Sequence, residues 1–146
     1  MRLTLVGVRL PGREFCDATG ELGNVHVGVQ LGREPRDLVP GDAAEARWEI
    51  EIDTVVATDG SIDFRGSAVQ GKRGERFVYL TWGNVDALGH FHMFRRAKLM
   101  LNRIEPTVLA DALEHERLSA HIELTDERGG PRCARVDPPA IRWHVD

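Results

Sequence analysis

The residues best suited to chemistry are cations that gather in the middle of the chain. Residues 65–103 contain eight lysines or arginines and only two carboxylates, a net charge of +6, whereas the whole 146-residue chain carries −4. Guanidinium and ammonium groups bind carboxylates and phosphates through charge-assisted hydrogen bonds. The middle segment therefore predicts a site for an anionic ligand or an acidic partner. The alternative is that the acidic flanking segments neutralise these cations within the fold.

The densest part of this segment is the glycine-rich stretch Gln70-Gly-Lys-Arg-Gly-Glu-Arg76. Glycine allows a ligand to approach the backbone closely, and three cations within these few residues favour an anion. The stretch is not a P-loop, because the Gly-Lys-Ser/Thr ending is missing and a strand is expected where a helix should follow. A solvated hairpin loop between two strands explains the same residues without a ligand.

A second set of cations lies on a segment whose apolar residues have helical spacing. Over residues 91–104, Phe94, Ala97, Met100, Leu101 and Ile104 fall on one arc of a helical wheel, and the cations Arg95, Arg96, Lys98 and Arg103 lie outside it. Packed beside the strand that begins at Arg76, such a helix would bring both sets together. The predicted ligand-binding residues are then Arg65, Gln70, Lys72, Arg73, Arg76, Tyr79, Arg95 and Arg96. A merely solvated helix face remains the alternative.

The sequence gives little support for a metal site, a bound cofactor or nucleophilic catalysis. His90-Phe-His92 has the spacing of a metal-binding pair, but a zinc or iron site needs at least three protein ligands and no carboxylate follows at a suitable spacing, so we expect no metal. No cofactor motif is apparent. Cys16 and Cys133 lack any motif that lowers a thiol pKa, and without a secretion signal we expect them to be reduced.

Three classes of function are compatible with these residues. The favoured one is a non-catalytic module that binds a small anionic molecule or an acidic protein surface. The alternative is a small barrel-type enzyme, an isomerase, cyclase or hydrolase, in which Tyr79, His90 or His92 transfers protons. A single-stranded nucleic-acid binder that stacks bases on Tyr79 and Trp82 is weaker, because the chain is acidic overall.

Most of the chain has the two-residue period of β-strands. Apolar residues either alternate with polar ones or form a continuous run in five segments: residues 2–10, 24–31, 46–56 and 118–124, and the end of the chain from Ile141. Asp59-Gly60 predicts a hairpin turn, and Leu38-Val-Pro-Gly-Asp42 predicts another turn. Residues 76–82 are apolar on both faces, which predicts a central strand.

These elements predict an α+β fold in one domain, residues 1–146. We expect a mainly antiparallel β-sandwich or partly open barrel, with two consecutive helices (91–104 and 106–115) packed on one side. The chain shows no signal peptide and no apolar run long enough to span a membrane, so we expect a cytoplasmic protein that does not contact membranes. Self-association as a homo-oligomer stays open.

Several stretches together resemble one bacterial protein family. They include Asp37-Leu-Val-Pro-Gly-Asp42, Val69-Gln-Gly-Lys-Arg-Gly-Glu75, Phe94-Arg-Arg-Ala-Lys-Leu-Met-Leu101 and Pro138-Pro-Ala140. Together they resemble the family called domain of unknown function 5990 over nearly the whole chain. The resemblance implies a compact stand-alone domain. It implies no activity, and no catalytic residue can be transferred from it.

Overall fold

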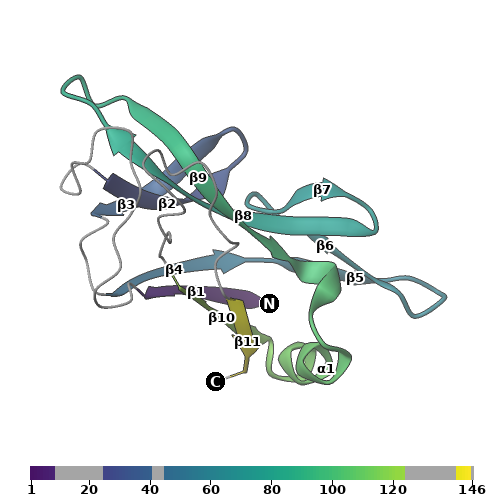
Figure 1. Cartoon of the computed structure of the whole chain (residues 1–146). Helices are drawn as coiled ribbons and strands as arrows, with labels where there is room; N and C mark the ends of the chain where they lie inside the picture. The colour runs from purple at the N-terminus through teal and green to yellow at the C-terminus, as the bar shows by residue number, and fades with distance from the viewer. Residues whose placement is uncertain (9–24, 41–44, 124–140, 146) are drawn as a thin grey trace, which may run out of the picture.

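The computed structural model describes residues 1–8, 25–40, 45–123 and 141–145 (Figure 1). Cys16 and Cys133 lie outside these ranges, so the prediction about them stays a prediction. For Trp82 and Arg95 the structure describes the backbone only.

Two larger sheets enclose a common core. One has the strand order β11-β10-β1-β4 and contains β1 (Arg2–Val8), β4 (Glu45–Glu51), β10 (Arg117–Glu123) and β11 (Ile141–His144). The other is five-stranded and contains β2 (Val25–Leu31), β3 (Glu34–Pro40), β7 (Gln70–Lys72), β8 (Glu75–Val85) and β9 (Phe91–Met100). Figure 1 shows the second sheet lying over the first. Fully buried side chains from both, including Leu5, Val29, Leu80 and Ile122, pack in one cluster.

The expected sandwich-like β architecture is confirmed, but the fold is not a closed barrel. Most neighbouring strands are antiparallel, whereas β1 and β10 pair in parallel. The long strand predicted over residues 46–56 is divided into β4 and β5 (Asp53–Val56), and β5 pairs with β6 (Ile62–Arg65) as a separate two-stranded hairpin. The Asp59-Gly60 turn joins these two strands, as predicted.

The prediction that residues 76–82 form a central strand is confirmed by β8. One edge of β8 pairs with β7 at Phe77 and with β2 from Leu80 to Asn84, and the opposite edge pairs with β9 from Phe77 to Val85. Alternate β8 side chains, Val78 and Leu80, are fully buried in the core between the sheets. Strand β8 therefore organises the five-stranded sheet.

The prediction of a helix over residues 91–104 is wrong. Strand β9 covers most of this segment, and only a short 3₁₀ turn, Leu101–Arg103, follows it. Ala97 and Leu99 are buried while Arg96 and Lys98 are exposed, which is the alternation of a strand. The helical wheel had placed Leu99 outside the apolar arc. The edge of β8 that does not pair with β2 or β7 supplies backbone hydrogen-bond partners between Phe91 and Met100. These partners favour a strand over a helix.

The second predicted helix is confirmed as α1 (Pro106–His115). Pro106 occupies its first turn, where a missing N–H costs no hydrogen bond, and Glu116 ends it in the left-handed conformation at φ 57°. Ala112 is buried, and the helix contacts β10 and β11 (Figure 1). The fold therefore contains one of the two helices expected.

The prediction of a turn at residues 38–42 is also wrong for residues 38–40, the part of this segment that the structure describes. Leu38, Val39 and Pro40 belong to strand β3, which pairs with β2. The Nε1–H of buried Trp48 donates to the Asp37 carbonyl at 2.9 Å and so ties β3 to β4 in the other sheet. Residues 41 and 42 lie outside the described part of the chain.

Candidate ligand-binding site

Strands β8 and β9 carry cations and aromatic rings on the face of the sheet that points away from the core. Tyr79 alternates with the buried Val78 and Leu80, and Arg96 alternates with the buried Ala97, so both lie on the outer face. The Arg96 guanidinium carbon lies 4.2 Å from the Tyr79 ring centroid. This cation–π contact holds the guanidinium over the ring.

A bulge in β9 changes which residues share this face with Arg96. The register shifts opposite Trp82 and Gly83, so that Met93 rather than Phe94 is paired with Gly83. A Cβ atom at Gly83 would collide with the His92 carbonyl and the Met93 backbone, so glycine is required for this close approach. The bulge thus brings Met93 to the same face as Arg96.

Met93 and Arg96 line a groove, which we call the outer groove. Its volume is about 580 Å³, within the usual range for small-molecule sites of roughly 300–1,000 Å³. Its lining residues come from β2, β3, β8, β9 and the connecting hairpins: Gln30, Arg33, Glu34, Pro35, Leu38, Thr81, Gly89, His90, Phe91, Met93 and Arg96. Buried Thr81 lies at the base, where its hydroxyl donates to the Gly28 carbonyl at 3.2 Å.

Strand β3 forms one wall of the outer groove because β2 has a glycine opposite it. A Cβ atom at Gly28 would lie 2.6 Å from the Arg36 carbonyl oxygen and 2.8 Å from Leu38 Cδ2. Only a residue without a side chain lets β3 approach this closely, and the register of the β2–β3 pair shifts at the same point. Leu38 therefore overlies β2 and contributes apolar surface to the groove.

The β8–β9 hairpin next to the groove is organised by one carboxylate. Asp86 accepts hydrogen bonds from the N–H groups of Leu88 and His90, each at 2.9 Å, and contacts His92 Nε2 at 2.8 Å. The hydrogen bond from His92, helped by the two backbone N–H groups, lowers the pKa of Asp86 from 3.8 to about 2. His90 and His92 are thus placed around a turn-stabilising carboxylate rather than converging with Tyr79.

The charged side chains of the outer groove are two arginines and one glutamate. Arg33 and Arg96 line it together with Glu34. Within the described ranges, neither arginine forms an ion pair with a carboxylate. The groove therefore has guanidinium groups that an external anion can reach.

Other predicted cations are neutralised inside the protein. The Asp63 carboxylate contacts Arg76 Nε at 3.0 Å and Arg65 Nε at 3.4 Å, and only 9% of its side chain is exposed. The hydrogen bond from Arg76 lowers the pKa of Asp63 despite the opposing effect of burial. We call Asp63, Arg65 and Arg76 the Asp63 cluster. It is the internal neutralisation considered as the alternative to a binding site.

The glycine-rich stretch is the turn between β7 and β8. Lys72 pairs with Glu75 across this two-residue turn, and Lys72 and Arg73 are exposed. The Gln70 side-chain amide donates to the Gly32 carbonyl at 3.3 Å. From Glu75 to Thr81 the strand rises about 20 Å at ~3.3 Å per residue, so Lys72 and Arg73 do not converge with Arg96. Arg95 lies in β9 opposite Trp82, with only its backbone described.

The comparisons with known proteins agree with the resemblance seen in the sequence. All 146 residues match the model of a protein family described as a family of unknown function, DUF5990. The chain belongs to the DUF5990 family. No curated protein and no solved structure matches this DUF5990 protein. Within the described residues, no helix is long and apolar enough to cross a membrane.

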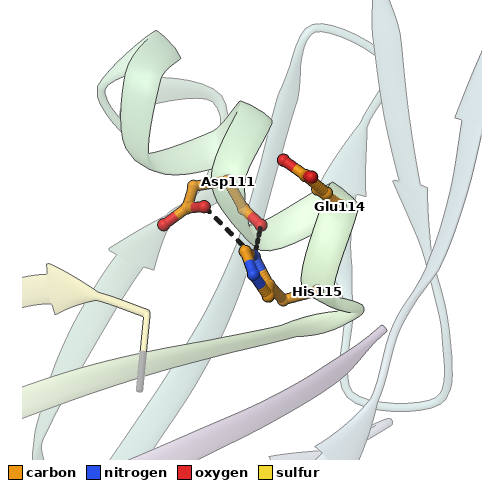
Figure 2. A group of neighbouring side chains, drawn as sticks. All are labelled: Asp111, Glu114 and His115. Atoms are coloured by element: carbon orange, nitrogen blue, oxygen red, sulfur yellow. Dashed lines mark hydrogen bonds and ion pairs between the residues drawn. The ribbon is translucent and has the colours of Figure 1, made fainter.

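One group of side chains on α1 of the DUF5990 protein has the composition of a metal site. Asp111, Glu114 and His115 offer ligand atoms that lie within 4.8 Å of one another. Figure 2 shows His115 turned toward Asp111, with Nδ1 3.1 Å from its carboxylate and 2.9 Å from its carbonyl oxygen. All three side chains are exposed and come from one helix. Such a group is common on helix surfaces without a metal.

Sequence reasoning missed most of the outer groove. Arg33, Glu34, Leu38 and Met93 were not candidates, because β3 was not predicted and β9 was expected to be helical. The glycine in Leu31-Gly-Arg-Glu34 was a usable signal, because Gly32 adopts a positive φ of 62° in a two-residue hairpin turn. Gly83, directly after the predicted strand 76–82, was a similar signal for the bulge that exposes Met93, because a glycine within a strand often marks a bulge or a close backbone approach.

Proposed function

We propose that this protein is a non-catalytic module that binds a small anionic molecule in the outer groove. The observation that carries the proposal is Arg96, whose guanidinium is positioned by Tyr79 beside a groove of about 580 Å³ and has no carboxylate partner among the described residues. A guanidinium held in one orientation loses little freedom when it binds a ligand. Arg33, in the turn between β2 and β3, supplies a second cation to the lining.

Five other cations of the basic segment support this location by elimination. Arg65 and Arg76 are engaged by Asp63, and Lys98 Nζ lies 3.3 Å from Glu75. Lys72 and Arg73 are exposed on a hairpin turn that forms no part of the groove lining. Of the predicted ligand-binding residues, Arg96 and its stacking partner Tyr79 are therefore the two that the proposal retains at the binding surface.

The experiment is a titration of the ¹⁵N-labelled full-length protein, followed by amide chemical shifts. Acetate, octanoate and inorganic phosphate are added separately at constant ionic strength. We expect at least one of them to cause saturable shifts at Leu38, Thr81 and Met93, the groove residues on three different strands. Constant ionic strength separates specific binding from charge screening.

Two matched variants locate the binding. Arg96→Gln should abolish the saturable shifts, and Lys72→Gln, which removes an exposed cation far along the sheet, should leave them intact. The proposal is overturned if no anion gives saturable shifts, or if Arg96→Gln binds as well as the wild type. Salt-sensitive retention on a single-stranded oligonucleotide column that depends on Lys72 and Arg73 would instead favour nucleic acid.

A further inference from the structure

We infer that the outer groove selects a monocarboxylate that carries an apolar body, in preference to phosphates. This inference rests on the proposed function and names the ligand class for that site. Three features of the groove support it: the number and shape of its charged groups, the state of the nearby backbone N–H groups, and the apolar surface on its walls.

The charge of the groove suits one negative charge. Arg33 and Arg96 are opposed by Glu34, so the arginines and the carboxylate of the lining sum to a charge of +1. Lys98, two residues along β9 from Arg96, is held by Glu75 and lies 4.1 Å from the Phe77 ring centroid. The Arg96 guanidinium, which lies over the Tyr79 ring, carries paired N–H groups that can donate to both oxygens of one carboxylate.

The backbone of the β8–β9 hairpin beside the groove is not available for a phosphate. Phosphate sites commonly use successive free N–H groups that point into one concavity. At the β8–β9 hairpin, the N–H groups of Leu88 and His90 donate to the Asp86 carboxylate, and that of Gly89 donates to the Asp86 carbonyl at 3.0 Å. The hairpin therefore offers no set of free donors of the kind that a phosphate requires.

The walls of the groove provide an apolar surface beside Arg96. Leu38 is 38% exposed on β3 and Met93 is 50% exposed on β9, and both line the groove together with half-buried Phe91. Exposed large apolar side chains that gather around a positioned polar group are typical of small-molecule sites. A ligand with its carboxylate on Arg96 can cover these side chains with a hydrocarbon chain or ring.

The test compares acetate, octanoate, 1-octanol and inorganic phosphate by titration calorimetry and amide shifts, with octanoate kept below its micellar concentration. Octanoate should bind at least about tenfold more tightly than acetate, because each buried methylene strengthens binding roughly fourfold. Octanoate should also bind more tightly than octanol and phosphate. Arg96→Gln should weaken octanoate binding by about 10- to 100-fold, because a charge-assisted hydrogen bond is lost.

A second variant separates the apolar contribution from the charge. Met93→Gln should weaken octanoate severalfold and leave acetate unchanged, and Val56→Gln, an equally conservative change at a 65% exposed position on β5, should alter neither. If octanoate binds no better than acetate, or phosphate binds best, while Arg96→Gln still abolishes binding, the carboxylate inference is wrong and the proposed function stands. If Arg96→Gln changes nothing, the proposed function itself fails.

Discussion

The cations of the basic segment are used in two different ways in two regions of the molecule. In the Asp63 cluster, Arg76 is only 20% exposed along its side chain and is bonded to a nearly buried carboxylate. On the outer face of β9, Arg96 is exposed and rests on an aromatic ring beside a groove. Both arginines belong to the basic segment of residues 65–103, and the difference lies in whether the fold places a carboxylate within reach. Clustered charge therefore indicates a site only after internal partners have been accounted for.

The largest effect on stability is expected when the nearly buried carboxylate of Asp63 is removed. Asp63→Asn should lower the melting temperature by several degrees, because it leaves the largely covered Arg76 guanidinium without its charged partner. Thermal unfolding followed by circular dichroism measures the change. A melting temperature equal to that of the wild type would show that the Asp63 cluster is not structural.

The matched change in the other region is Arg96→Gln. It should lower the melting temperature by at most about 2–3 °C, the value expected from one exposed cation–π contact. A decrease as large as that of Asp63→Asn would place Arg96 among the structural cations and remove the contrast between the two regions.

An intermediate effect is expected from pH. The folded-state pKa of Asp86 is about 2, below its ordinary value of 3.8, so in acid the unfolded chain binds more protons. The stability that Asp86 contributes is fully present above about pH 4 and is lost as the pH falls through 2. Asp63, whose pKa is also lowered, acts in the same direction.

The measurement is urea unfolding between pH 5 and 2. Asp86→Asn should flatten the dependence of stability on pH in this window, whereas Glu114→Gln, at an exposed position on α1, should reproduce the wild-type slope. Equal slopes for Asp86→Asn and the wild type would show that the hairpin carboxylate is not held by His92 and the backbone in solution.

The smallest effect is expected for Lys72→Gln. Lys72 is exposed in the β7–β8 turn and, in the described part of the chain, forms no ion pair. Exposed substitutions of this kind change stability by no more than about 0.5 kcal/mol. Melting temperature and anion binding should both stay at wild-type values. If Lys72→Gln instead lost anion binding, the binding site would have to include the glycine-rich stretch.

The strands that sequence predicted well are those whose pattern is set by local chemistry. Trp48, Ile50 and Ile52 alternate with Glu49 and Glu51, and the structure places the first set inward and the carboxylates outward. Pro106 marked the start of α1 for an equally local reason, since proline is tolerated in the first helical turn.

The candidate site was predictable only in part. Arg96 and Tyr79 were among the predicted residues, and they do lie together. They were expected on a helix and a strand, and are instead on two paired strands. The segment from Phe91 to Met100 satisfies both a helical and a strand pattern, because its bulge interrupts the alternation. Periodicity alone does not resolve such a case.

By itself, the sequence of this protein determined its family, its largely β character and the central position of β8. These properties follow from local alternation, from turn residues and from motifs that neighbouring residues carry together. Only the tertiary structure decided that β9 is a strand, that Asp63 neutralises Arg65 and Arg76, and that Arg96 faces a groove. Each of these depends on a partner distant in sequence, because backbone hydrogen bonds and ion pairs form between segments that only the folded chain brings together.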